Sequence, residues 1–175
     1  MTLYKDTYRV ESTRLKDWDY STPGDYYVTI LTQNRLNLFG SISDGVLLPS
    51  IPAEIAKNCW LSLESRYKNI KLFDFVFMTD HMHGMISIVT KTDATLSAMV
   101  GAFKSISTIE INKSQNTPGN IVWYERFYDR IVRSDVEFYF VSEYIKNNPL
   151  KNEPAMKELE WFDLMQEREK REKNP

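Results

Sequence analysis

The segment from Ile70 to Thr90 constrains the fold more than any other part of the chain. Two runs of apolar and β-branched residues, Ile70 to Met78 and His83 to Thr90, predict two strands. The interval around Thr79 and Asp80 is too short to hold more than a tight turn, so we expect the strands to pair as an antiparallel hairpin. The fold should therefore contain an antiparallel sheet.

Residue patterns before this hairpin predict two further strands and a helix. Tyr26 to Thr32 has the β-branched and aromatic content of a strand, and Leu38 to Gly45 is expected to be a shorter strand ending in the Asp44-Gly45 turn pair. A helix should begin at Pro52, because Pro suits the first helical position and apolar residues recur every four positions from Ile55 to Tyr67.

The second half of the chain predicts two helices and one strand. An amphipathic helix is expected from Thr95 to Lys113, a last strand around Ile121 to Trp123, and a final helix from Asp135 to Asn148. Pro149 disfavours helical geometry at the residue before it and should end that helix. The complete order indicates an α+β sandwich, with helices packed mainly on one face of an antiparallel sheet.

Composition limits the class of protein. A chain of 175 residues with 42% hydrophobic residues predicts one globular domain, here residues 1–152, followed by a charged tail over 153–175. No stretch approaches the roughly 18 apolar residues of a membrane helix, and the N-terminus lacks a signal-peptide core, so we expect a cytoplasmic protein without a membrane partner. A net charge of −2 does not by itself indicate a nucleic-acid partner.

The chain has only two histidines, and they form the His-x-His pair of His81 and His83. In a strand their imidazoles would share one face and could chelate a divalent metal, while Met82 would point into the opposite, apolar layer. A third ligand, for which an oxygen donor is expected, must come from elsewhere in the fold. An isolated His-x-His pair occurs more often without a metal than with one, so spacing alone leaves both interpretations open.

His81-Met82-His83, followed by SEYIKNNPLKN from Ser142 to Asn152, resembles the single-tyrosine HUH transposases, in which U is a hydrophobic residue. The order and spacing are similar to the REP-associated tyrosine transposases, relatives of the insertion-sequence 200/605 class. The chain departs from many relatives by having Met78-Thr79-Asp80 where they have Met-Pro-Asn. Four further segments carry the resemblance: RLKDWDYSTPGDYYVTILTQNRLNLFG, FDFVFMTDHMHGMISIV, FKS and VWYERFYDRIVR.

The resemblance implies a ferredoxin-like fold, with the histidines on a central strand and a nucleophilic tyrosine on the C-terminal helix. By position in the motif, the nucleophile is Tyr144 and the third metal ligand is Asn148, with Asn147 as the alternative. Residues four apart share one helical face, so Tyr144 and Asn148 can face the same point. Without the resemblance, a tyrosine that merely packs in the core is the more frequent case.

The column Val136, Phe140 and Tyr144 has the spacing of a buried stripe, which is the structural alternative for Tyr144. Tyr128 and Tyr139 are the other tyrosines that an experiment must exclude as nucleophile.

The implied activity is cleavage and rejoining of single-stranded DNA at hairpin-containing element ends. Mg²⁺ or Mn²⁺ would be held by His81, His83 and Asn148, and Tyr144 would form a 5′-phosphotyrosine bond. The protein would bind single-stranded or hairpin DNA as a monomer or homodimer. Two alternatives are an inactive hairpin-DNA-binding regulator and a metal-dependent phosphodiesterase that uses water.

Basic side chains near the expected site are candidate phosphate contacts, although each can equally be a solvated surface charge. Trp123, Tyr124 and Phe127 lie among them and can either stack on bases or pack in the core. The candidate phosphate contacts are Arg14, Lys16, Lys104, Arg126, Arg130 and Arg133.

Overall fold

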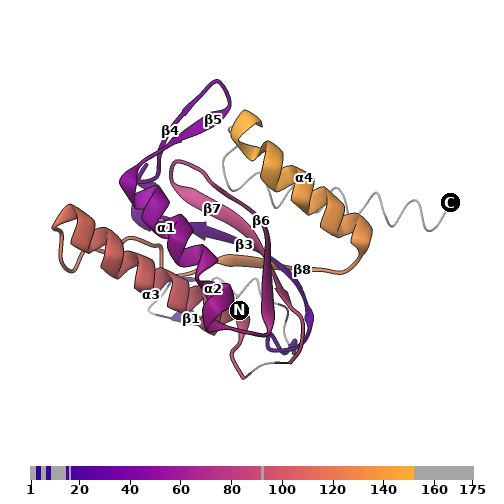
Figure 1. The fold of residues 1–175 in the computed structure, drawn as a ribbon. Coiled ribbons are helices and arrows are strands. Elements are labelled where there is room, and N and C mark those ends of the chain that lie inside the picture. Colours follow the sequence, from indigo (N-terminus) through magenta and orange to yellow (C-terminus); the bar gives the residue numbers. More distant parts are fainter. Residues whose placement is uncertain (1–2, 5–6, 9–14, 16, 92, 152–175) are drawn as a thin grey trace.

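A computed structural model describes residues 3–4, 7–8, 15, 17–91 and 93–151, and its centre is a four-stranded antiparallel sheet (Figure 1). The strand order is β6-β7-β3-β8, so β7 has a neighbour on each side. The predicted antiparallel hairpin is confirmed as β6 and β7. The four strands are β3 (Gly24–Leu31), β6 (Ile70–Phe77), β7 (His81–Ile88) and β8 (Tyr128–Val132).

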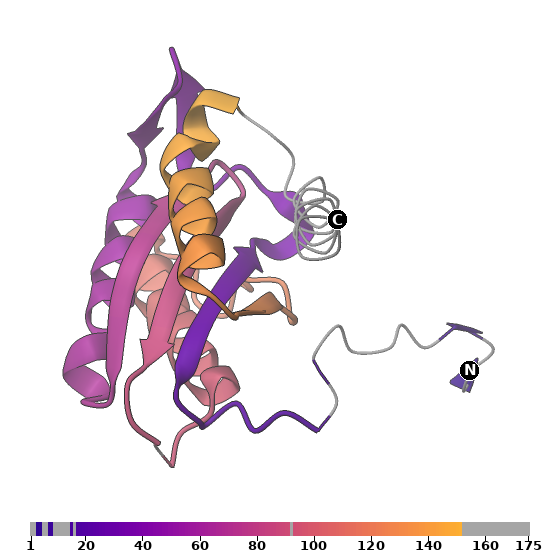
Figure 2. The ribbon, with the colours of Figure 1, turned by 90° about the vertical axis from the view of Figure 1, so that its right-hand side faces the viewer.

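Helices cover both faces of this sheet. The helices α1 (Ile51–Leu61) and α3 (Leu96–Gln115) pack on one face, with the short α2 (Leu63–Arg66) following α1. Figure 2 shows α4 (Asp135–Lys151) on the other side of the sheet. The expectation that helices pack mainly on one face therefore holds for α1 and α3, whereas α4 covers the opposite face.

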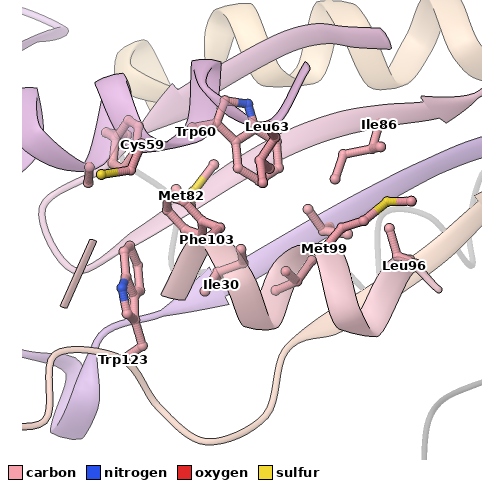
Figure 3. Packing of buried hydrophobic residues seen from close by; sticks show 14 of the residues in the cluster. Ile30, Cys59, Trp60, Leu63, Met82, Ile86, Leu96, Met99, Phe103 and Trp123 are labelled. Carbon is pink, nitrogen blue, oxygen red and sulfur yellow. The ribbon is translucent and has the colours of Figure 1, made fainter. Parts of the chain in front are cut away.

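The larger core lies between the sheet and the helices α1 and α3 (Figure 3). Trp60 and Phe103 pack with ring centroids 5.3 Å apart, and Phe103 also contacts Trp123 at 5.1 Å. Trp60 crosses β7 at Gly84, where a Cβ atom would lie 2.6 Å from the indole ring. Only glycine leaves room for this close approach.

A smaller core lies between the sheet and α4. It consists of six buried residues from the sheet and the helix, and Val76 and Phe138 pack against it. Alternation along β3 and β7 creates both cores, because successive side chains of a strand point to opposite faces. The six residues are Tyr27, Met85, Val132, Val141, Tyr144 and Ile145.

The remaining elements lie outside the sheet. The ribbon β4 (Gly40–Ser43) and β5 (Val46–Pro49) turns at Asp44 and Gly45, both with positive φ, as the turn pair predicts. The short strands β1 (Leu3–Tyr4) and β2 (Thr7–Tyr8) pair with each other, and the 3-10 helix η1 (Gln33–Arg35) follows β3. Among the described residues, no helix combines the length and hydropathy needed to cross a membrane.

The prediction of a last strand at Ile121 to Trp123 is wrong. Trp123 forms only an isolated bridge with Thr32, and the strand is β8, which pairs with β3 from Asp25 to Thr29. Both segments follow the same edge of the sheet: the Tyr124 N–H still donates to the Leu31 carbonyl of β3, and regular pairing resumes only at Tyr128. In the interval, the carbonyl groups of residues 124–126 accept hydrogen bonds from Lys104 on α3.

The predicted end of the last helix at Asn148 is also wrong, since α4 continues through Pro149 to Lys151. Proline lacks an N–H, so the helix forgoes one hydrogen bond there without ending. The charged tail over 153–175 and the candidate DNA contacts Arg14 and Lys16 lie outside the described residues.

Candidate active site

The two histidines lie on the face of β7 that α4 covers. His81 and His83 are both buried, and their Nε2 atoms lie 3.0 Å apart. The ring centroids are 4.6 Å apart at an interplanar angle of 68°. The prediction that both imidazoles share one face is therefore confirmed, and each directs the same nitrogen toward the other.

The outer nitrogen of each imidazole has its own partners. His81 Nδ1 lies 2.6 Å from Asp80 Oδ1. His83 Nδ1 lies 2.9 Å from the Tyr27 hydroxyl and 3.1 Å from Thr29 Oγ1, both on the neighbouring strand β3. Metal-binding histidines commonly have this arrangement, in which hydrogen bonds to one ring nitrogen orient the other toward the metal.

Electrostatics favours a neutral imidazole at His83. Burial lowers the pKa of His83 well below its usual value, and the neighbouring His81 and Arg35 add to the effect. Burial opposes ionisation of Asp80, but hydrogen bonds from His81 and Arg35 outweigh it and hold the pKa of this carboxyl below its usual value. A neutral imidazole has a lone pair for a metal, so His83 is in the required state.

Helix α4 brings Tyr144 to the histidines. Its ring centroid lies 5.8 Å from that of His83 and 6.5 Å from that of Tyr27. Tyr144 is 3% exposed, whereas Val136 is 56% and Phe140 38% exposed, so their column is not a buried stripe. Tyr139 is 61% exposed on the outer side of the helix. Tyr144 is thus the tyrosine of α4 that faces the sheet.

Asn148 lies one turn after Tyr144 and is fully buried. Among the residues that the structure describes, neither the oxygen nor the nitrogen of its amide has a hydrogen-bond partner. Burying an amide without hydrogen-bond partners costs about 1–3 kcal/mol of folding free energy, so the buried position of Asn148 needs an explanation. The alternative ligand Asn147 instead donates to the Glu143 carbonyl at 2.8 Å within its own helix.

The donor set fits a divalent cation. Two ligands at right angles and about 2.1 Å from a metal lie about 3.0 Å apart, which matches the separation of the two Nε2 atoms. No three residues of the described chain from the set His, Cys, Asp and Glu cluster as a metal site. An amide oxygen from Asn148 would supply the third donor, as its partnerless buried side chain suggests.

Polar contacts hold α4 on the sheet. Ser142 donates a hydrogen bond to Asp74 on β6, and Lys146 Nζ lies 3.6 Å from the same carboxylate. At the other end, Arg130 Nε donates to Glu137 Oε1 at 2.7 Å and joins β8 to the first turns of the helix. These contacts fix the position of the helix that carries Tyr144.

Two of the four candidate DNA contacts that the structure describes are engaged within the protein. Lys104 Nζ donates to the carbonyls of residues 124, 125 and 126 at 2.9, 3.3 and 2.9 Å, and Arg130 pairs with Glu137. Arg126 and Arg133 are exposed. Of the three nearby aromatics, Trp123 is buried and Phe127 half-buried, whereas Tyr124 is 40% exposed and can stack on a base.

Sequence reasoning missed three residues that contact the histidines, Tyr27, Thr29 and Asp80. It also missed Arg35, which contacts Asp80. Asp80 is adjacent to His81, so the sequence contained a signal for it. Thr29 pairs with His83 only through the register of β3 against β7, which no local pattern reveals.

Comparisons with known proteins identify the family. Residues 51–148 match the sequence profile of the family described as "Transposase IS200 like". An uncharacterized protein of Haemophilus influenzae is 28% identical over 159 residues, which are 79% of this chain and 87% of that protein.

Two solved structures match the chain. A REP-associated tyrosine transposase bound to a REP hairpin has a TM-score of 0.61 at 15% identity, over 81% of this chain and 74% of that chain. A putative transposase from Deinococcus radiodurans R1 has a TM-score of 0.48 at 16% identity, over 78% and 97%. The first shares the fold, and the profile match spans more than half of the sequence. The chain therefore belongs to the IS200-like transposase family.

Proposed function

We propose that this protein is a metal-dependent transposase that cleaves and rejoins single-stranded DNA at hairpin-containing element ends through a 5′-phosphotyrosine. Its family supports the general activity. The observation that carries the specific chemistry is the buried cluster in which two facing Nε2 atoms, 3.0 Å apart, lie beside the ring of Tyr144.

His81 Nε2, His83 Nε2 and the Asn148 amide oxygen would hold Mg²⁺ or Mn²⁺. Such a cation supplies Lewis acidity to the non-bridging oxygens of the scissile phosphate. Asp80, Tyr27 and Thr29 orient the imidazoles through hydrogen bonds at their Nδ1 atoms. The chain thus provides three neutral donors, which leaves the positive charge of the cation available to the phosphate.

Tyr144 is the proposed nucleophile. Its phenolic oxygen forms a bond to phosphorus, the bond from phosphorus to the 3′ oxygen breaks, the phenolic proton leaves, and the 3′ oxygen takes up a proton. The 3′-hydroxyl of another strand can reverse the step, which rejoins DNA without ATP. The side chains of His81, His83, Tyr144 and Asn148 are buried, so neighbouring segments must shift before DNA reaches them.

A covalent adduct assay tests this proposal. Purified protein is incubated with labelled single-stranded hairpin DNA and Mn²⁺, and a complex that survives denaturation is sought. We expect the complex with the parent chain and with the control variants Tyr128→Phe and Tyr139→Phe, but not with Tyr144→Phe or in the presence of chelator.

The same assay separates the alternatives. Cleaved DNA without an adduct would contradict the tyrosine mechanism and support a phosphodiesterase that uses water. Binding without cleavage would support a DNA-binding regulator.

A further inference from the structure

Asp80 connects the metal-binding pair to Arg35 through both of its carboxylate oxygens. Arg35 Nε lies 2.5 Å from Oδ2, and His81 Nδ1 lies 2.6 Å from Oδ1. Arg35 is 45 residues away in sequence and has positive φ, in the segment that follows β3. Each oxygen of the Asp80 carboxylate therefore has a different partner.

The main chain around Asp80 is also held. Its carbonyl accepts hydrogen bonds from both the backbone N–H and the hydroxyl of Thr32, each at 2.9 Å. The Thr79 carbonyl accepts from the Phe39 N–H at 3.0 Å, and the Met78 N–H donates to the His81 carbonyl at 2.8 Å. The carboxylate therefore has little freedom to turn away from His81.

A carboxylate only accepts hydrogen bonds, so the Nδ1 of His81 must be the donor. In a neutral imidazole, Nε2 then has the lone pair. The Nε2 of His83 lies 3.0 Å from the Nε2 of His81. When no metal is bound, it must therefore donate the hydrogen bond to that lone pair. The two imidazoles are thus not equivalent, although they face each other.

His83 has a different kind of support. The hydroxyl groups of Tyr27 and Thr29 lie within 3.1 Å of its Nδ1, and a hydroxyl can either donate or accept. His83 can therefore move its proton from Nε2 to Nδ1, as binding a metal through Nε2 requires. Only His81 has its tautomer dictated by its surroundings.

We propose that Arg35 and Asp80 are positioning residues that fix His81 in the tautomer with a metal-ready Nε2, while the hydroxyls of Tyr27 and Thr29 allow His83 to change tautomer on metal binding. This inference rests on the metal centre of the proposed function. It assigns the two imidazoles different roles within one site.

The variant Asp80→Asn tests the inference because it keeps the shape of the side chain. Arg35 only donates, so it would take the single oxygen of the new amide and leave the NH₂ group facing His81. His81 would then accept at Nδ1 and carry its proton on Nε2, which blocks the metal. Removing Arg35 as well, in Arg35→Met with Asp80→Asn, frees the amide to rotate and should restore part of the binding.

Two readouts on the untagged full chain decide the outcome. The ¹⁵N NMR spectrum of the imidazoles reports the tautomers, and it is simple because the chain has two histidines. We expect a proton on Nδ1 of His81 and on Nε2 of His83 without metal, and on Nδ1 of both with saturating Mg²⁺. Calorimetric titration with Mn²⁺ should show an affinity about 10-fold or more lower in Asp80→Asn and partly recovered in the double variant.

The matched control is Asp19→Asn, which removes a carboxylate that pairs with Lys91 away from the histidines. It should change neither readout. A parent protein whose His81 carries its proton on Nε2 would overturn the inference without any variant, as would unchanged Mn²⁺ affinity in Asp80→Asn. A parent that binds no Mn²⁺ would overturn the metal centre itself and the positioning role with it.

Discussion

The two faces of β7 are both buried, apart from the half-buried Ser87, but they differ in chemistry. Met82 and Ile86 pack under α1 and α3, whereas His81 and His83 lie under α4. Apolar burial contributes about 25 cal/mol per Å² to stability, whereas burial of polar groups opposes folding unless they find partners. The comparison indicates that one face of the strand packs the larger apolar core and that the other carries the proposed chemistry.

The hydrogen-bond partners on the polar face support the proposed metal centre. Its imidazole Nδ1 atoms are hydrogen-bonded, yet the buried amide of Asn148 has no partner among the described residues. A face selected only for packing would not retain such a group, because a leucine would fill the same space. Variants on the two faces should therefore change different properties.

Trp60→Ala should have the largest effect, since it removes the central side chain of the apolar face. We expect the free energy of unfolding to fall by about 3–5 kcal/mol, measured by urea denaturation. Tyr139→Ala, at a side chain 61% exposed, is the control and should change stability little. Equal losses for both variants would contradict the assignment of stability to this face.

Asn148→Leu should separate metal binding from stability. In the parent, Mn²⁺ at 100 times its dissociation constant should raise the free energy of unfolding by about 2.7 kcal/mol, and the variant should lose this gain. Without metal the variant should be at least as stable as the parent, because it removes an amide without partners. Asn147→Ala is the control and should keep the Mn²⁺ effect, measured by thermal unfolding with and without metal.

Gly84→Ala and Gly101→Ala form a pair with opposite signs. A methyl group at Gly84 meets the Trp60 ring at 2.6 Å, which should destabilise the protein by about 1–3 kcal/mol. At Gly101 in α3, nothing lies within 4 Å of the new methyl, so better helix propensity should add up to about 1 kcal/mol. Chemical denaturation of both variants measures the difference. A neutral Gly84→Ala would mean that Trp60 does not lie on the strand.

Lys104→Met should have the smallest effect, about 0.5–1.5 kcal/mol, because it removes partly solvated hydrogen bonds to residues 124–126. Hydrogen exchange in that segment should accelerate. Lys113→Met, at an exposed lysine on the same helix, is the control. A Lys104→Met variant with unchanged exchange but weaker, less salt-dependent DNA binding would instead identify Lys104 as a phosphate contact.

Local sequence patterns predicted most of the fold. Runs of apolar, aromatic and β-branched residues located β3, β6 and β7, and apolar residues at helical spacing located α1 and α3, because each pattern depends on neighbours within one element. The strand β8 was misplaced because regular pairing with β3 begins only at Tyr128, after a segment whose carbonyl groups accept hydrogen bonds from the distant Lys104. The strand β5 was missed, since the run after Gly45 is short and three of its four residues are exposed.

The candidate site could also be predicted only in part from the sequence. The resemblance located His81, His83, Tyr144 and Asn148, and the structure brings the first three together and buries the fourth one helical turn from Tyr144. Arg35 could not be predicted as a partner of Asp80, since the contact depends on how the chain turns after β3. Strand register placed Thr29 opposite His83 in the same way.

The most direct test of the central claim is crystallography of the full chain soaked in Mn²⁺, with anomalous scattering used to locate the metal. The claim is that the buried polar cluster under α4 is a divalent metal centre. We predict one strong anomalous peak in contact with the Nε2 atoms of His81 and His83 and with the Asn148 oxygen. A saturated crystal with no peak there, or with a peak that does not touch the histidines, would contradict the account.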